Sequence, residues 1–259
     1  MHFAFLGTSG AVASAERDTT SLVFVSRAGS ILVDCGGGPV HRLRRLGVDP
    51  LALSHVVVTH VHPDHAYGLP SLVQNLVLLG RRGSLTVVCR PEHVEPLQAL
   101  LRVFALWPAR PTAFALDVVP VRLDVGALAF ESGGLRVRTA PNAHGAMPNF
   151  AVRVEPDTGP AVVYSSDTEP ADSVVALARG ADTLVHEATF PERHRGRYGA
   201  HSTAADAGRV AARAGVRRLI LTHIDADYHG EVEALAAEAR VAFGGAVEVA
   251  RELLPYPLG

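Results

Sequence analysis

The sequence contains no lysine, so all 24 of its basic residues are arginine. This bias, together with the heavy use of Ala, Val, Leu and Gly, indicates genome composition rather than a function. The arginines are outnumbered by 26 acidic residues, and the formal net charge is −2. A protein that binds nucleic acid over a broad surface needs a clear positive excess, and this chain lacks one. Any contact with nucleic acid must therefore be made at a local site.

Cysteine is also scarce, with only Cys35 and Cys89. Two cysteines make no disulfide framework, and both lie in apolar, strand-like stretches, so we expect reduced, buried side chains. No apolar run approaches the ~18 residues that span a bilayer. The N-terminal MHFAFLGTSG has no basic segment followed by a long apolar one, as a secretory signal would. We expect a cytoplasmic protein with no membrane partner.

The 259 residues, 48% of them hydrophobic, suffice for a sizeable core and exclude a disordered chain. Short apolar runs bounded by Gly and Ser predict strands at 2–6, 21–25, 30–38, 55–60, 85–89, 161–167, 183–188, 217–223 and 246–250, with more in 113–154. Helical spacing predicts helices at 39–46, 66–79, 91–106, 170–179, 202–214 and 230–243. Two strand-rich blocks, each followed by helices, favour a layered α/β fold, with one domain over residues 1–259.

The strongest motif is THVHPDH at 59–65, which places His60, His62, Asp64 and His65 within six residues. Imidazole and carboxylate are ligands that zinc favours. In an extended segment alternate side chains point the same way, so we expect His60, His62 and Asp64 on one side. His65 then faces a second metal.

Further candidates follow other predicted strands, in the places where α/β sheets bind their ligands. These candidates are His144, Asp167, Glu187, His201 and His223. Taken singly, the histidines would more often be structural, but together with 59–65 they favour a metal site. Asp34, also at a strand end, is expected to hydrogen-bond to the metal loop without binding metal.

On these motifs the sequence resembles the metallo-β-lactamase superfamily, whose HxHxDH signature is matched at 60–65. Within it, the chain looks most like the ribonuclease Z branch. The matching pieces are FLGTSGA, LVDCGGG, THVHPDH, YSSDT, HEATF and HSTAADAGRVAARAGVRRLILTH. The resemblance implies an αββα sandwich in a single domain, with a di-zinc site between the two sheet edges.

The resemblance also implies the ligand roles. His60, His62 and His144 would hold the first zinc ion, Asp64, His65 and His223 the second, and Asp167 would bridge both. Manganese is an alternative metal. Two such ions would activate a metal-bound hydroxide and stabilise phosphoryl oxygens.

Three residues carry catalytic roles by the same resemblance. Asp64 would orient the nucleophile or accept its proton. Glu187 would orient His201, and His201 would protonate the leaving alkoxide as a general acid. Since alkoxides need such help, the pair favours phosphodiester cleavage over lactam hydrolysis.

The sequence departs from the ribonuclease Z pattern in two motifs and in one insertion. The family's DCGEGTQ is DCGGGPV at 34–40, and the segment after the last histidine is IDADYH at 224–229. That branch carries a long arm for tRNA between the positions of His144 and Asp167, and here only 22 residues separate them. A small phosphodiester, such as a cyclic nucleotide or a short RNA, therefore fits better than a large structured RNA. A ribonuclease Z-type tRNA 3′ endonuclease and an arylsulfatase-like ester hydrolase remain alternatives within enzymes. The non-enzyme alternative is a metal-dependent binding scaffold, which predicts lost ligands.

The basic segment 191–200 supplies candidates for substrate binding. Arg195 and Arg197 would offer a guanidinium to a phosphate, with a solvated loop as the plainer alternative. Tyr198 would stack on a base, although a lone loop tyrosine more often has a packing role. The apolar segment 97–107 would allow a homodimer, although core packing is its commoner use.

Overall fold

The computed structural model describes residues 1–108, 113–197 and 199–258. Within them, the first sheet has the strand order β14–β1–β2–β3–β4–β5–β6. Its strands are β1 (His2–Gly7), β2 (Ser21–Ser26), β3 (Gly29–Val33), β4 (Leu53–Val57), β5 (Leu85–Cys89), β6 (Leu116–Pro120) and β14 (Tyr256–Pro257). The second sheet has the order β13–β12–β11–β10–β9–β8–β7. It contains β7 (Ala127–Ser132), β8 (Leu135–Pro141), β9 (Phe150–Pro156), β10 (Val162–Tyr164), β11 (Thr183–Glu187), β12 (Arg218–Thr222) and β13 (Ala246–Val249).

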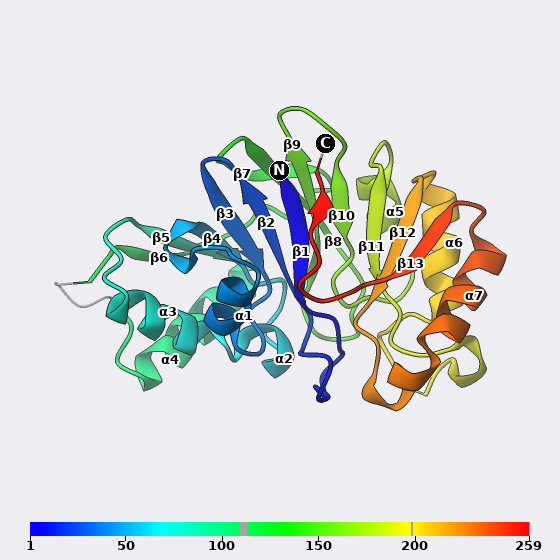
Figure 1. Cartoon of the computed structure of the whole chain (residues 1–259), viewed down its shortest axis with the longest axis horizontal. Helices are drawn as coiled ribbons and strands as arrows, with labels where there is room; N and C mark the ends of the chain where they lie inside the picture. Colours follow the sequence, from blue (N-terminus) through cyan, green and yellow to red (C-terminus); the bar gives the residue numbers. More distant parts are fainter. Residues whose placement is uncertain (109–112, 198, 259) are drawn as a thin grey trace.

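Helices cover the outer face of each sheet (Figure 1). The first sheet carries α1 (Pro39–Arg45), α2 (Pro63–Ala66), α3 (Leu69–Leu78) and α4 (Val94–Val103). The second carries α5 (Asp172–Ala178), α6 (Ala204–Ala214) and α7 (Val232–Ala242). The layers therefore run helix, sheet, sheet, helix, as the predicted αββα sandwich requires.

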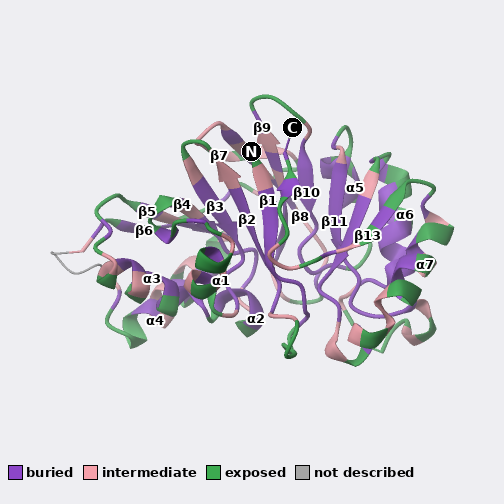
Figure 2. Ribbon diagram, in the orientation of Figure 1, coloured by how far each residue is buried: buried purple, intermediate pink, exposed green. Residues whose placement is uncertain are grey.

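Three apolar layers hold the sandwich together. One lies between the sheets and contains Phe3, Phe5, Phe24 and Tyr164, and the other two lie under the helices. Along β12 the side chains alternate, with Ile220 in the middle layer and its neighbours under α6 and α7. Burial on both faces explains why these strands read as continuous apolar runs. Figure 2 shows strands such as β10 and β11 buried and the helices exposed on their outer side.

The two cysteines, Cys35 and Cys89, are free and buried as predicted. No helix in the described part of the chain is both long and apolar enough to cross a bilayer.

The strand directions bring several chain turns to one edge. β3 to β6 run parallel to one another, as do β10 to β13. β8 runs in the same direction as β10, because both pair antiparallel with β9. The segments that follow β4, β8, β10, β11 and β12 consequently emerge at the same edge, where ligand sites of α/β proteins form.

Candidate metal centre

The predicted ligands all follow strands that end at this shared edge. The segment 58–65 follows β4, whereas His144, Asp167 and His223 follow β8, β10 and β12. The first segment comes from one sheet and the other three residues come from the second. The site therefore exists only where the two sheets meet.

Four side chains form a first group, His60, His62, His144 and Asp167. Nδ1 of His62 lies 3.0 Å from Nε2 of His60 and 3.1 Å from Nε2 of His144. Oδ2 of Asp167 lies 3.7 Å from Nε2 of His60 and 3.9 Å from Nε2 of His144. Ligand atoms about 2.0–2.2 Å from a tetrahedral ion lie roughly 3.3 Å apart. These four atoms are thus spaced to hold one ion.

A second group consists of Asp64, His65, Asp167 and His223. Oδ2 of Asp167 is 3.3 Å from Nε2 of His65 and 3.2 Å from Nε2 of His223. Oδ2 of Asp64 lies 3.3 Å and 3.4 Å from the same two nitrogens. Because Asp167 belongs to both groups, its carboxylate lies where a bridging ligand would.

Two buried atoms of this cluster support a cation there. Nε2 of His65 and Oδ1 of Asp167 have no hydrogen-bonding partner. Buried polar atoms in folded proteins are nearly always paired, and imidazole and carboxylate are metal ligands. The residues therefore fit divalent metal ions.

The expected common side of His60, His62 and Asp64 is correct only for the two histidines, which belong to one group. His62 is extended, but helix α2 begins directly after it at Pro63, with His62 as its N-cap. Proline favours the first helical position, because its fixed φ suits the helix and its missing N–H is not needed there. Asp64 therefore turns away from His60 and His62 toward His65 and His223. The prediction that all three share one side is wrong for Asp64.

Asp34 contacts a histidine of the second group without belonging to that group, as predicted. Its Oδ2 lies 2.8 Å from Nδ1 of His65, and its Oδ1 accepts hydrogen bonds from the N–H and hydroxyl of Thr59. Tyr164 donates to the same carboxylate at 3.2 Å. The contact fixes the His65 ring so that Nε2 faces Asp64 and Asp167.

Two residues of the loop between β11 and α6, Thr189 and Ala200, orient the rings of further histidines. The carbonyl of Ala200 accepts a hydrogen bond from Nδ1 of His144 at 2.8 Å. Thr189 lies with its hydroxyl 3.1 Å from Nδ1 of His223 and 3.3 Å from Nδ1 of His201. Sequence reasoning did not single out Thr189, although it lies inside the HEATF motif at 186–190.

Strained backbone marks the same edge. Asp34, Ser166, Ala200 and His223 have φ values of 59°, 53°, 69° and 55°. Side chains other than glycine adopt this left-handed region at a cost, and such residues cluster at functional sites. Each of the four is a ligand candidate, contacts one, or precedes one in sequence.

Glu187 and His201 form a pair beside both metal groups. Oε1 of Glu187 lies 2.8 Å from Nδ1 of His201. The ring of His201 lies 4.8 Å from that of His144 and 5.4 Å from that of His223, between ring centroids. It is therefore next to one histidine of each group.

Glu187 has no free oxygen for a metal. The N–H of Thr168 also donates to its Oε1, and the N–H and hydroxyl of Thr189 donate to its Oε2. Its carboxylate is fully buried. Although Glu187, His201 and His223 lie close enough to hold an ion, these hydrogen bonds assign Glu187 to positioning His201.

The buried charges of the cluster perturb one another. Burial alone would raise the pKa of Asp167, but His223 and His65 outweigh it and hold this pKa well below its usual range. Burial would lower the pKa of His223, but Asp167 raises it to about 10. Burial, followed by the neighbouring His65, lowers the pKa of His60. His60 thus favours the neutral ring that metal ions require.

The arginines predicted to bind substrate have protein partners. Arg195 forms ion pairs with Glu192 and Asp206, at 2.7 Å and 2.9 Å. Arg197 contacts the Tyr228 hydroxyl and lies 3.2 Å from Asp227. Their contact with a substrate stays a prediction. Tyr198 lies outside the described residues.

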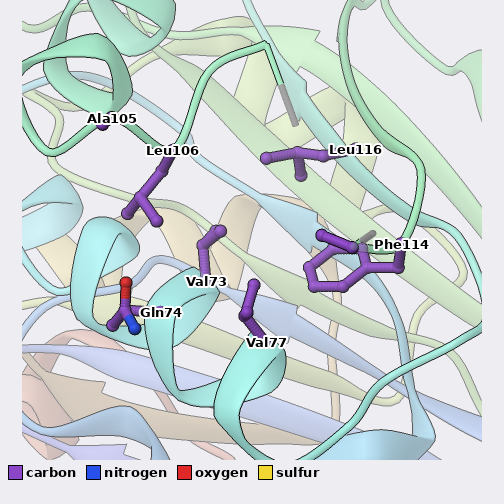
Figure 3. A pocket seen from close by; sticks show the side chains of 8 residues that line it. Val73, Gln74, Val77, Ala105, Leu106, Phe114 and Leu116 are labelled. Carbon is purple, nitrogen blue, oxygen red and sulfur yellow. The ribbon is translucent and has the colours of Figure 1, made fainter. Parts of the chain in front are cut away.

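An apolar cavity elsewhere lies between α3 and two chain segments, 105–106 and 113–116 (Figure 3). Val73, Val77, Phe114 and Leu116 line it, and among the described lining residues Gln74 alone has a polar side chain. None of the candidate ligands borders it. We interpret it as a gap in the core under α3.

The family relationship follows from comparison with known proteins. Residues 30–224 match the model of the β-lactamase superfamily domain. The chain belongs to the β-lactamase superfamily. It is accordingly a metal-dependent hydrolase of that superfamily, with an αββα fold and with clusters of histidine and carboxylate side chains that could hold divalent metal.

Among curated relatives, a ribonuclease Z of Halorubrum lacusprofundi is 34% identical over 292 residues, covering 93% of this chain and 92% of that protein. Those 292 positions exceed the 259 residues of this chain, so the relative has segments that this chain lacks. The resemblance to ribonuclease Z is thereby confirmed.

Solved structures agree on the fold. The metallo-β-lactamase fold protein YhfI of Bacillus subtilis has a TM-score of 0.83 and 25% identity, covering 98% of both chains. The short form of human tRNase Z has a TM-score of 0.81 with 22% identity, covering all of both chains. Both cover nearly the whole of this chain.

Proposed function

We propose that this protein is a di-metal phosphodiesterase whose substrate is short, single-stranded RNA. The observation that supports this reaction most is the pair of Glu187 and His201, which lies beside both metal groups. Oε1 of Glu187 is 2.8 Å from Nδ1 of His201. An ester with a poor leaving group needs a proton donor at that place. A lactamase has no evident use for such a pair.

The metal ligands are part of the same proposal. His60, His62 and His144 would hold one ion, Asp64, His65 and His223 the other, with Asp167 shared. Zinc suits this nitrogen and oxygen set, and manganese is the alternative. When bound, such ions supply Lewis acidity toward the phosphoryl oxygens and lower the pKa of a coordinated water.

The chain's own residues complete the reaction. Glu187 accepts the Nδ1 proton of His201, which leaves Nε2 of that ring to donate a proton to the departing alkoxide oxygen. Asp64 accepts or orients the proton of the attacking water. Thr189 holds the rings of His201 and His223 in a fixed relation. Ala200 and Asp34 fix the rings of His144 and His65, so the ligand geometry is set before substrate arrives.

Two observations support a short RNA over other diesters. The curated relatives at 34% identity are named ribonuclease Z. Yet the residues between His144 and Asp167 are occupied by a loop, β9 and β10, which leaves no length for an extended arm. A single RNA strand has no large folded body for an arm to bind, so it is consistent with both observations.

The test is hydrolysis of bis(p-nitrophenyl) phosphate and of a short labelled RNA by the purified protein. The protein is assayed as isolated, after chelation, and after reloading with zinc or manganese. Loss on chelation and recovery with metal support the proposal. A protein that holds metal and cleaves neither diester contradicts it, and aryl sulfates are then assayed.

A ribonuclease Z-type tRNA 3′ endonuclease is the second candidate. It is favoured by the extent of the likeness to curated ribonuclease Z, which covers nine tenths of both chains. A precursor tRNA with a 3′ trailer separates the two. Cleavage of the precursor at least as efficient as that of the free trailer strand favours this second candidate.

A further inference from the structure

A polar cleft lies on the outer side of the first sheet, between α1 and α3. It has a volume of about 480 Å³ and is lined by Gly38, His41, Arg44 and Arg45 from one side and by Ser71 and Asn75 from the other. Clefts of about 300–1,000 Å³ are typical of ligand sites. Among the described residues, no carboxylate lines this one.

Arg44 and Arg45 are cations without a protein counterion. Both are exposed, and neither has a side-chain hydrogen bond or ion pair within the described residues. Arg42 of the same helix, by contrast, is bound by Glu252 and lies 3.4 Å from Asp18. Arg195 and Arg197 also have carboxylate partners. The two guanidinium groups of the cleft are thus available to an anion.

The cleft begins close to the metal centre. A Cβ added to Gly36 would lie 2.0 Å from the backbone oxygen of Asp64, so this loop packs directly against the ligand segment. Gly38 follows two residues later, at most about 7 Å along the chain. On the other wall, α3 begins directly after α2, which carries Asp64 and His65. Figure 1 shows α1 in front of the first sheet, between α2 and α3.

We infer that this cleft binds phosphates of the RNA strand that flank the scissile bond, through Arg44 and Arg45. This inference rests on the proposed function and adds the path of the strand. A guanidinium offers a planar fork of N–H donors that matches phosphate oxygens. His41, Ser71 and Asn75 add hydrogen-bonding groups along the same path. The strand would run from the metal centre along α1.

Charge distribution supports a local site of this kind. The chain has a net charge of −2, so attraction of RNA depends on where unpaired arginines gather. Neutralising each phosphate of a single strand contributes about −0.7 to the slope of log affinity against log salt. Two arginine contacts therefore account for a slope of roughly −1.4.

The experiment compares the double variant R44A/R45A with the matched control R27A/R179A. Arg27 and Arg179 also have no side-chain partner among the described residues, and they follow β2 and α5, at the opposite ends of the strands from the site. Both double variants remove the same charge. Binding of a fluorescent 12-nucleotide RNA is measured by anisotropy at several salt concentrations. Hydrolysis of bis(p-nitrophenyl) phosphate and light scattering on a sizing column accompany it.

We expect R44A/R45A to weaken RNA binding about tenfold or more and to flatten the salt slope by roughly 1.4, with little change in hydrolysis of the small diester. Equal RNA affinity in R44A/R45A and R27A/R179A would overturn the inference. So would a change of oligomeric state in R44A/R45A alone, which would identify the cleft as a contact between copies. Wild-type protein that hydrolyses no diester refutes the proposed function instead, and the anisotropy result still decides whether the cleft binds RNA.

Discussion

Nδ1 of His144 donates a hydrogen bond to the carbonyl oxygen of Ala200, one residue before His201, at 2.8 Å. A proposed metal ligand and the proposed general acid are thus held by neighbouring residues of one loop. The loop closes on itself through a bridge between Phe190 and Thr203, and Thr203 caps α6 with Asp206. Any shift of this loop moves both groups together.

Gly145 provides a direct test of that coupling. Its φ is +56°, and a Cβ added there would lie 3.1 Å from the Ala200 side chain. We expect G145A to displace Ala200 and weaken metal binding by roughly 10- to 100-fold, as loss of outer contacts to a ligand does. Metal titration checks this. Gly83 has open space around it, so G83A should bind metal like the wild type.

The shared position of Asp167 predicts unequal effects on metal content. We expect about two metal equivalents in the wild type, about one in H144A, and almost none in D167A. The reason is that His144 belongs to one ligand group and Asp167 to both. Elemental analysis after dialysis measures this. Equal metal content in H144A and D167A would argue against a bridging role.

Replacement of His201 should depend on the leaving group. We expect H201A to lose roughly 10²- to 10⁴-fold in kcat on RNA, whose alkoxide needs a proton. On bis(p-nitrophenyl) phosphate, whose leaving group is stable as an anion, the loss should stay within about tenfold. Equal losses on both substrates would mean that His201 has a structural role.

Glu187 should set the alkaline limit of activity. Burial lowers the pKa of His201, but Glu187 outweighs burial and raises it. The acid acts when protonated, so activity is lost as pH rises through that pKa. We expect E187Q to move this loss to lower pH and to reduce stability by roughly 1–3 kcal/mol, because an amide cannot accept all four present hydrogen bonds. A pH profile of kcat on RNA and a denaturant titration measure the two effects, and an unchanged alkaline limit would contradict the assignment.

Metal uptake should release protons. The carboxylate of Asp167 raises the pKa of His223 to about 10 from 6.5, so a cation must displace a proton at neutral pH. Metal affinity should therefore rise with pH up to about 10. In chelated protein the same pair stabilises the fold below pH 6.5, and that stability is lost as pH rises through about 10. Calorimetry in buffers of different ionisation enthalpy counts the protons, and a heat independent of buffer would refute the expectation.

Much of the architecture could be predicted from sequence because its strands are buried on both faces and its ligands follow strand ends. Boundaries were less accurate. The run 55–60 was predicted as strand, but β4 ends at Val57, since the ligand segment must leave the sheet. β14 has only two residues, too few for any periodicity. It was not predicted.

The site's supporting contacts were harder to predict than its ligands. Asp34 could be anticipated because it ends a strand near the motif. Ala200 acts through its backbone carbonyl, which every residue type has, so the sequence does not indicate this role. The partners of Arg195 likewise depend on where α6 packs, and Asp206 lies eleven residues away.

Glu252 links the last part of the chain to the first. Its carboxylate accepts hydrogen bonds from the N–H groups of Thr8 and Asp18, and it binds Arg42 of α1. The loop between Thr8 and Asp18 reaches the metal edge, where Gly10 lies against the ring of His223. This loop is therefore held on one side by a residue that lies outside every proposed ligand segment. A chain without the Glu252 carboxylate would keep every proposed metal ligand, but the wall beside His223 would lose part of its support.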